Sequence, residues 1–291
     1  MRARVLSADD LGSISTFDWV DHSRKVFLEG DSVYVPVLSG HSYDTCVPDR
    51  QRRGRGYQRL GDTILFHGRR PDSDDVADLM VREEPSCILF IPGHSGSLRV
   101  PAYEVIYGSP HEVLHRECGI SYRLDPTKVM FSQGNRGEKQ RMRSLISSSG
   151  KEERIADMFA GIGYFTLTAA DAGGMVHAME LNPDSFGFLM KNIDENGLTE
   201  EIRAECGDCR DMLSGTYDRV IMGHFEATEY LDSALLHVAF GSVIHLHTLR
   251  PDEGGIRSIL HEHGYDADIS VHKVKKYAPQ CWHCVMDLVI G

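Results

Sequence analysis

The run Arg154-Ile-Ala-Asp157-Met-Phe-Ala-Gly161-Ile-Gly163 decides the fold of the second half of this chain. A strand predicted over 154–159 leads into a glycine turn, and a helix is expected over about 163–172. Glycine permits a tight turn and a close approach of the backbone to a ligand. Thr166 stands where a dinucleotide fingerprint has its third glycine, so no clear pyrophosphate cradle is present. Asp157, an acid at the strand end, instead suits a cofactor that carries an ammonium group.

Strands and helices alternate after this turn. Strands are predicted at 175–180, 202–206, 217–222 and 242–247, with helices over about 183–196, 227–239 and 255–263. This alternation is typical of a parallel sheet with helices on both faces. The segments 267–274 and 281–290 are predicted to be two further strands with no helix between them. A parallel sheet closed by an antiparallel hairpin favours a doubly wound α/β fold of the class I methyltransferase-like (Rossmann-type) kind over a dinucleotide dehydrogenase.

Further acids are expected at the edge of the sheet where the glycine turn lies. Glu180 ends the strand over 175–180, nineteen residues after Gly161, close to the roughly twenty-residue offset of a ribose-binding acid. Asp208 follows the strand over 202–206 and is placed to contact an adenine amino group, with Cys209 offering backbone or thiol contact. Each acid alone is more often a helix cap or a solvated loop residue. Together with Asp157 and Gly163 they predict binding of S-adenosyl-L-methionine.

The first hundred residues or so have the pattern of a smaller α+β domain. Short strand-like runs at 32–37, 63–66 and 87–92 are broken by Gly, Pro and Asp, and only 73–82 predicts a helix. We expect an N-terminal domain over 1–110 and a cofactor-binding domain over 111–291. The arginine-rich stretch 49–59 is predicted to be a mobile loop on the N-terminal domain.

The charge of the chain argues against a protein that is basic throughout. Its 291 residues include 31 basic and 43 acidic side chains, for a net charge of −12. Three local clusters still favour an anionic partner, although each alone is more often a solvated face. The clusters are Arg50, Arg52, Arg53, Arg55 and Arg59; Arg136, Lys139, Arg141 and Arg143; and Lys273, Lys275, Lys276 and Tyr277. Without a long apolar run or a signal-peptide pattern, we expect a cytoplasmic protein with no membrane partner.

The cysteines do not predict a disulfide framework. There are seven of them, an odd number, in a chain that is expected to be cytoplasmic. The pairs Cys206/Cys209 and Cys281/Cys284 have the spacing of a four-thiolate zinc site. However, Cys281 and Cys284 lie on a predicted strand, where residues three apart point to opposite faces. We therefore expect no metal at these pairs.

Four segments of the chain together resemble one known family. They are His115-Arg-Glu-Cys-Gly-Ile-Ser-Tyr122, Lys128-Val-Met-Phe-Ser-Gln-Gly-Asn135, the turn over 157–163, and Lys276-Tyr-Ala-Pro-Gln-Cys-Trp-His283. The family comprises archaeal and eukaryotic enzymes that modify the purine 3′ of the tRNA anticodon, and the resemblance runs from about Tyr57 to the C-terminus. Its branches include the tRNA guanine-N1 methyltransferases and the wybutosine-synthesising aminocarboxypropyltransferases.

The resemblance implies further cofactor contacts before the glycine turn. Carried over to this chain, Ser132 and Lys139 would reach the methionine end of S-adenosyl-L-methionine. Related proteins often have arginine at the second position, and lysine keeps the charge but loses the two-pronged fork that suits a carboxylate. Asn135 and Arg136 could equally contact RNA. The resemblance also places the histidine pairs 245/247 and 111/115 in scaffold segments, so no metal is expected there.

The residues that follow the strand over 217–222 distinguish the branches. Methyltransferases acting on a base nitrogen commonly carry Asn-Leu-Pro or Asn-Pro-Pro here, whereas this chain has Met222-Gly223-His224-Phe225. This variant resembles the aminocarboxypropyl branch. It implies transfer of the 3-amino-3-carboxypropyl group of S-adenosyl-L-methionine to a carbon of 4-demethylwyosine in phenylalanine tRNA. Methyl transfer to guanine at the same tRNA site is the alternative.

The sequence assigns no catalytic residue. The acceptor carbon is itself the nucleophile, and its proton can leave afterwards, so no general base is demanded. His224 is explained at least as well by a structural role at a strand end. Two hypotheses outside this family stay open: an RNA-binding module with a vestigial cofactor fold, and a small-molecule methyltransferase. The three acids of the cofactor edge count against the first, and the arginine-rich stretch would be unexplained by the second.

Overall fold

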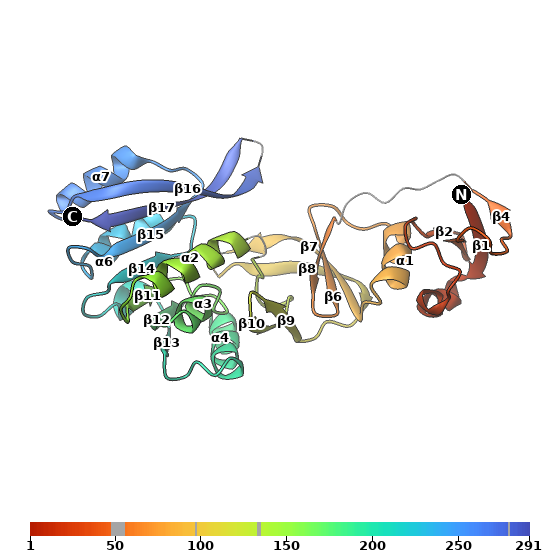
Figure 1. The fold of residues 1–291 in the computed structure, drawn as a ribbon, viewed down its shortest axis with the longest axis horizontal. Coiled ribbons are helices and arrows are strands. Elements are labelled where there is room, and N and C mark those ends of the chain that lie inside the picture. Colours follow the sequence, from red (N-terminus) through yellow and green to blue (C-terminus); the bar gives the residue numbers. More distant parts are fainter. Residues whose placement is uncertain (48–55, 97, 133–134, 279) are drawn as a thin grey trace. The chain divides into compact units, whose positions relative to one another are not determined.

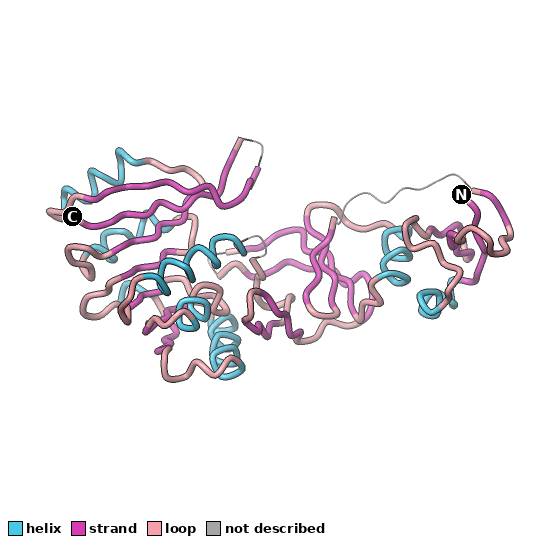
Figure 2. Tube along the Cα trace, in the orientation of Figure 1, coloured by secondary structure: helices cyan, strands magenta, loops and turns pink. Residues whose placement is uncertain are grey.

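A computed structural model describes residues 1–291 apart from 48–55, 97, 133–134 and 279 (Figures 1 and 2). The chain divides into two compact units. Unit 1 comprises Met1–Val113 and Asp125–Met130, and unit 2 comprises Leu114–Leu124 and Phe131–Gly291. The expectation of separate domains over 1–110 and 111–291 stays a prediction. Among the described residues, no helix has the length and apolar character needed to cross a bilayer.

A seven-stranded sheet forms the centre of unit 2 (Figure 1), in the order β13-β12-β11-β14-β15-β17-β16. The strands are β11 (Arg154–Asp157), β12 (Met175–Glu180), β13 (Ile202–Cys206), β14 (Arg219–Met222), β15 (Val243–Thr248), β16 (Ala267–Ala278) and β17 (Cys281–Ile290). Strands β11 to β15 are parallel, and β17 runs antiparallel between β15 and β16. The parallel sheet with a C-terminal antiparallel hairpin is therefore observed as predicted. All carboxyl ends of the parallel strands share one edge.

Helices cover both faces of this sheet. They are α2 (Arg136–Ser148), α3 (Thr166–Asp171), α4 (Pro183–Glu195), α5 (Cys209–Met212), the 3-10 helix η2 (Ala227–Tyr230), α6 (Leu231–Leu235) and α7 (Glu253–Glu262). Helices α6 and α7 bury Leu235 and Leu260 in a core that includes Met286 and Leu288 of β17. Each such leucine contributes roughly 2 kcal/mol. Because side chains alternate along a strand, the intervening Asp287 faces α2 on the opposite side.

Two predicted helices are shorter than expected. The glycine turn delays α3 to Thr166, because Gly161 and Gly163 adopt positive φ angles of 58° and 101°. The second helix, expected over 227–239, is split into η2 and α6 and ends at Leu235. The chain then turns, and the carbonyl of His237 accepts a hydrogen bond of 2.8 Å from the N–H of Tyr217.

Unit 1 contains two four-stranded sheets. The first has the order β2-β3-β1-β4 and the second β5-β6-β7-β8. Their bounds are β1 (Arg2–Ser7), β2 (Phe27–Glu29), β3 (Ser32–Pro36), β4 (Thr45–Cys46), β5 (Tyr57–Leu60), β6 (Thr63–His67), β7 (Cys87–Ser95) and β8 (Val100–Gly108). The 3-10 helix η1 (Ala8–Thr16) was not anticipated, whereas α1 (Ser73–Arg82) has the predicted bounds. Helix α1 begins with a capping box between Asp72 and Asp75 and buries Val81 toward the first sheet and Leu79 toward the second.

The prediction of a mobile arginine-rich loop over 49–59 is wrong at its C-terminal end, where the chain forms strand β5. Arg50, Arg52, Arg53 and Arg55 lie outside the described residues. Arg59 belongs to strand β5, where its guanidinium contacts the Glu83 carboxylate at 2.7 Å. Tyr57 is also in β5, and its hydroxyl donates to the other oxygen of Glu83 at 2.5 Å. Pairing with β6 and these contacts to the acid therefore hold 57–60 in a sheet.

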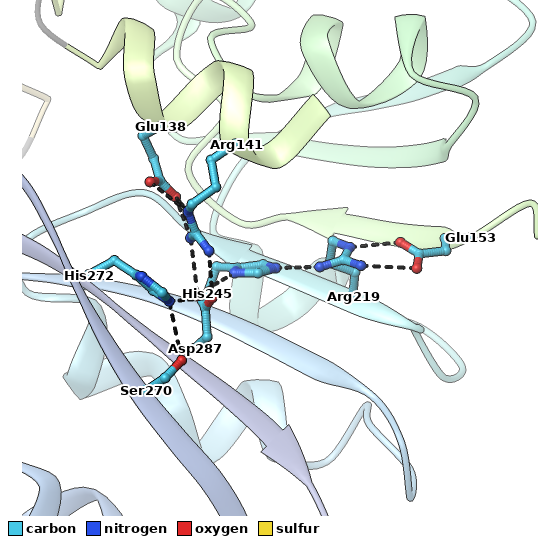
Figure 3. A network of polar contacts seen from close by, with 8 residues as sticks. All are labelled: Glu138, Arg141, Glu153, Arg219, His245, Ser270, His272 and Asp287. Carbon is cyan, nitrogen blue, oxygen red and sulfur yellow. Dashed lines mark hydrogen bonds and ion pairs between the residues drawn. The ribbon is translucent and has the colours of Figure 1, made fainter. Parts of the chain in front are cut away.

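A buried chain of charged groups fixes α2 to the sheet (Figure 3). Its members, in order, are Glu153, Arg219, His245, Asp287, Arg141 and Glu138. His245 contacts Arg219 at 2.5 Å and Asp287 at 2.6 Å, so both of its ring nitrogens are engaged. Burial alone would raise the pKa of Asp287, but hydrogen bonds from His245 and Arg141 hold it far below its usual range. His245 therefore belongs to a polar network that connects β14, β15, β17 and α2.

Candidate cofactor site

The glycine turn lies at the carboxyl edge, between β11 and α3. A side chain at Gly163 would bring its Cβ within 2.9 Å of Leu167 and 3.1 Å of Leu189. Positive φ at Gly161 and Gly163 adds a conformational reason for glycine. The turn therefore forms as predicted, and the packing of α3 and α4 leaves no room for a larger residue at 163.

Glu180 joins the ends of three neighbouring segments. Its Oε2 accepts the N–H of Gly161 at 2.7 Å, and its Oε1 accepts the N–H of Asn182 at 2.7 Å. Its backbone carbonyl accepts the N–H of Gly207, which precedes Asp208, at 2.9 Å. Burial raises the pKa of the Glu180 carboxyl. Each carboxylate oxygen has two lone pairs, so both can still accept a hydrogen bond from a ligand hydroxyl.

Asp157 is completely buried beneath the turn. Its Oδ2 accepts the hydroxyl of Thr166 at 2.7 Å, and its Oδ1 accepts the N–H of Phe159 at 3.4 Å. Burial raises the pKa of Asp157 to about 6. The carboxyl thus helps to hold the turn, and its contact with an ammonium group stays a prediction.

Asp208 caps the N-terminus of α5. Its carboxylate accepts the N–H of Arg210 at 3.0 Å and contacts the Arg210 guanidinium at 2.5 Å, and these hydrogen bonds lower the pKa of Asp208. Cys209 is 4% exposed, and burial raises the pKa of its thiol to about 12. The thiol is therefore protonated and unreactive at neutral pH. The expected contacts of both residues with an adenine ring stay predictions.

Lys139 is held in the interior. Its ammonium pairs with Glu117 and lies 4.9 Å from the ring centre of Tyr122 and 5.8 Å from that of Tyr164. Tyr164 also accepts the N–H of Ser132 at its hydroxyl, at 3.2 Å. The structure thus places Lys139 in a buried ion pair among aromatic rings. Its direct contact with the methionine end of a cofactor stays a prediction, as does that of Ser132.

Asn192 of α4 supports the turn, a role that sequence reasoning missed. Its side-chain amide donates to the carbonyl of Ile162 at 2.9 Å and its Oδ1 accepts the N–H of Arg123 at 2.6 Å. Arg123 lies in the hairpin of β9 (Val113–Glu117) and β10 (Ile120–Leu124). Asn196, one helical turn later, accepts the N–H of Ser121 in the same hairpin. The only sequence signal was two asparagines four apart, which share a helix face.

Aromatic side chains gather where β14 ends. The His224 ring stacks on Phe159, with centres 5.4 Å apart and an angle of 26° between the planes. Tyr230 meets Phe159 edge-on at 5.0 Å, and the Arg210 guanidinium lies 4.9 Å from the centre of Tyr230. A Cβ at Gly223 would lie 3.6 Å from the Phe165 ring. The edge beside the glycine turn is therefore aromatic.

The second basic cluster is largely neutralised inside unit 2. Lys139 pairs with Glu117, and Arg143 with Asp171. Arg141 belongs to the buried network of Figure 3. These three cations therefore stabilise the fold, and the cluster offers less charge to an external anion than its sequence indicates.

The cysteine and histidine pairs considered above as metal ligands can be located in the described part of the chain. All seven cysteines are free thiols. Within the described ranges, no group of three or more His, Cys, Asp or Glu side chains could share a metal ion. His115 lies in strand β9, and His111, which precedes that strand, contacts Asp62 at 2.9 Å.

Comparison with known proteins identifies the family. A model of the TRM5/TYW2 methyltransferase domain matches residues 113–274. The chain belongs to this family. It is 35% identical over 248 residues to tRNA(Phe) (4-demethylwyosine(37)-C(7)) aminocarboxypropyltransferase of Methanocaldococcus jannaschii, an alignment that covers 80% of this chain and 97% of that enzyme.

Solved structures of the family confirm the fold. The structure of M. jannaschii TYW2 in complex with AdoMet matches with a TM-score of 0.64 and 31% identity, covering 80% of this chain and 98% of the other. Trm5b from Pyrococcus abyssi matches with a TM-score of 0.70 and covers 99% of both chains. At 22% identity the second match shows the fold alone. The predicted class I methyltransferase-like fold is thus confirmed.

Proposed function

We propose that this chain is an S-adenosyl-L-methionine-dependent aminocarboxypropyltransferase of wybutosine biosynthesis. It transfers the 3-amino-3-carboxypropyl group to carbon 7 of 4-demethylwyosine at position 37 of tRNA(Phe). The observation that carries this proposal is the 35% identity that extends over 97% of the M. jannaschii enzyme with that name. The sequence Met222-Gly223-His224-Phe225 at the end of β14 supports the same branch, since it lacks the asparagine and proline that hold a base nitrogen.

The residues at the carboxyl edge fit the nucleoside part of this donor. Glu180, half-buried and fixed by two backbone N–H groups, has lone pairs left for the ribose hydroxyls. Asp208 and Cys209 follow strand β13, and we assign the adenine ring to the space beside them. Gly161 and Gly163 let the backbone approach the donor without a side chain between them.

In this proposal, residues around Ser132 bind the methionine end of the donor. The Tyr164 hydroxyl fixes the backbone of Ser132, and the Lys139–Glu117 pair packs against the Tyr164 ring. Asp157 offers a negative charge beneath the turn when it is ionised. The bound sulfonium supplies an electrophilic propyl carbon and 5′-methylthioadenosine as the leaving group. The protein contributes mainly by aligning this carbon with the acceptor.

The acceptor base stacks at the aromatic end of β14 in this proposal. Phe159, His224 and Tyr230 present ring faces and edges there, and stacking on such side chains contributes about 1–3 kcal/mol per base. The N-terminal domain contributes its arginines 50–55 to the tRNA backbone, an interaction that salt weakens. We also propose that the enzyme acts in the cytoplasm.

Analysis of the reaction products tests this function. Purified protein is incubated with S-adenosyl-L-methionine and tRNA(Phe) that carries 4-demethylwyosine, and both the nucleosides and the small products are identified by mass spectrometry. We expect 5′-methylthioadenosine and a nucleoside that has gained the aminocarboxypropyl group. A parallel incubation uses tRNA(Phe) that carries an unmodified guanosine at the same position, where S-adenosylhomocysteine with a methylated guanine would instead establish the guanine-N1 methyltransferase activity.

A further inference from the structure

The hairpin of β16 and β17 extends beyond the carboxyl edge of the parallel strands. Thr248, the last residue of β15, lies opposite Cys284, so the residues of β17 that precede Cys284 are beyond this edge. They continue to pair with β16, where Lys276 lies opposite Trp282. The donor and the acceptor base are assigned to the same edge in the proposed function. The end of the hairpin is therefore on the side of the sheet that carries the site.

One face of this hairpin carries two lysines and a tryptophan. Lys273 lies opposite Cys284 and Lys276 lies opposite Trp282, and residues that are directly opposite in an antiparallel pair share a face. Cys284 and Trp282 are two apart on β17, so they share that face as well. The Lys273 ammonium is 5.3 Å from the ring centre of Trp282. Trp282 is 39% exposed and both lysines are exposed, so this lysine–tryptophan face (Lys273, Lys276 and Trp282) is accessible from solution.

The positive charge of this face is not cancelled by nearby acids. In the part of the chain that the structure describes, neither Lys273 nor Lys276 forms an ion pair. From 269 to 286 the sequence has three lysines and no Asp or Glu, although the whole chain has a net charge of −12. Lys275, the third lysine, lies opposite His283 on the other face and is half-buried. A local excess of positive charge on an acidic protein favours an anionic partner.

Tyr277 connects the hairpin to the proposed acceptor site. Its ring meets the Phe225 ring with centres 5.4 Å apart, and 54% of the residue is exposed. Phe225 directly follows His224, whose ring stacks on Phe159. The hairpin thus lies beside the place that we assign to the acceptor base.

We propose that the lysine–tryptophan face binds unpaired nucleotides that flank the acceptor base, an inference that rests on the proposed function. The Trp282 ring stacks on one base, and the ammonium groups of Lys273 and Lys276 contact neighbouring phosphates. Proteins that bind single-stranded nucleic acid combine aromatic side chains and cations in this way. The hairpin thereby holds the anticodon loop while the acceptor base occupies the site.

Unpaired RNA fits this face better than an acidic peptide or a lipid headgroup does. Either of those would use the lysines, but neither has a flat ring to stack on an exposed indole. An unpaired nucleotide offers both a phosphate and a base face. In a duplex the base faces are stacked on one another, so they are not available to Trp282. The face should therefore prefer RNA with a loop over a closed duplex.

Tryptophan fluorescence tests the stacking directly, because the chain has only two tryptophans, Trp19 and Trp282. Trp19 is 7% exposed and belongs to unit 1. A tRNA(Phe) transcript is titrated into the wild type, W19F and W282F. We expect emission to be quenched in the wild type and in W19F, and to be unchanged in W282F. Equal quenching in W282F and the wild type, or equal quenching of the wild type by a closed RNA duplex, would overturn the proposal.

The affinity for tRNA(Phe) shows what the indole ring contributes. W282L removes the aromatic ring and should raise the dissociation constant roughly tenfold or more, the scale of one stacked base. W282F keeps a ring and should bind nearly as tightly as the wild type. This rescue by phenylalanine distinguishes stacking from a general loss of packing. Equal affinities of W282L and the wild type would remove Trp282 from the interface.

The salt dependence of binding shows what the lysines contribute. K273Q/K276Q should weaken binding and lower the slope of log affinity against log salt by about 0.7 for each lysine, as expected for single-stranded RNA. The matched control is K151Q/R203Q, which removes two exposed cations that pair with acids and changes the net charge equally. The control should keep the wild-type slope. The same slope in both double variants would show that Lys273 and Lys276 do not contact phosphates.

The outcomes separate this inference from the function on which it rests. If W282L and K273Q/K276Q bind tRNA(Phe) as the wild type does, the hairpin is not part of the interface. The wild type would then still release 5′-methylthioadenosine, and the proposed function would stand. If the wild type releases none from a competent tRNA, both proposals are overturned.

Discussion

The Glu180 carboxylate accepts the backbone N–H of Gly161 at 2.7 Å, which joins the end of β12 to the glycine turn after β11. This contact fixes the orientation of the Glu180 side chain without a ligand. The carbonyl of the same residue accepts the N–H of Gly207 and so aligns the start of α5. One side chain therefore organises the edge at which we place the donor.

Replacing Glu180 by alanine should weaken donor binding. E180A loses the acceptor for the ribose hydroxyls and releases the turn at Gly161. We expect the dissociation constant for S-adenosyl-L-methionine to rise about tenfold or more, the scale of one charge-assisted hydrogen bond. Calorimetric titration measures this change, with E195Q as a control because Glu195 pairs with Arg123 on the surface of α4. Equal affinities in E180A and wild type would remove Glu180 from the site.

The stability of the protein should depend on the ionisation of Asp157. Its folded pKa of about 6 lies above the ordinary value of 3.8. The stability that this carboxyl contributes is therefore fully present below about pH 4 and is lost as the pH rises through about 6. D157N cannot ionise. Relative to wild type, we expect its unfolding free energy to improve by up to about 3 kcal/mol between pH 4 and pH 8. Denaturant titrations at several pH values check this trend, and a difference that does not vary with pH would contradict it.

The buried pair of Lys139 and Glu117 should show strong coupling. K139M leaves Glu117 unpaired in the interior and should cost roughly 3–5 kcal/mol of stability, whereas K139M/E117Q should cost less. Lys151 and Asp218 form an exposed pair that serves as a control, and K151M should destabilise the protein far less than K139M. Urea unfolding of the wild type, K139M, E117Q and the double variant gives the coupling energy. Additive effects of K139M and E117Q would show that the pair is not coupled.

The N-terminal arginines should act on RNA and leave the donor unaffected. Replacing Arg52, Arg53 and Arg55 by glutamine should weaken tRNA binding and lower the slope of log affinity against log salt by about 0.7–0.9 for each phosphate that an arginine no longer neutralises. Affinity for S-adenosyl-L-methionine should not change. Filter binding at several salt concentrations measures both effects of the triple variant, with R203Q/R257Q as a charge control in unit 2. Unchanged tRNA affinity would remove this stretch from the interface.

Much of the fold follows from local patterns in the sequence. The bounds of β12, β13, β17 and α1 coincide with the predicted ones. The alternation of apolar residues indicates the strands, and Pro183 indicates the first turn of α4. The C-terminal hairpin also follows, because the two last predicted strands have no helix between them.

The remaining features depend on contacts between distant residues. Helix α2 has no counterpart among the predicted helices because it buries Glu138 and Lys139, which are stabilised by ion pairs that a hydrophobic pattern does not reveal. The burial of Lys139 escaped prediction for the same reason. His247 and His283 are far apart in sequence, and only the pairing of β15 with β17 brings them together.

A crystal structure with S-adenosyl-L-methionine would show how the donor binds at this edge. We expect the ribose hydroxyls on Glu180, the adenine beside Asp208, and the propyl carbon directed at the aromatic residues that follow β14. A donor absent from this edge at saturating concentration, or one whose methyl group faces His224, would contradict the account.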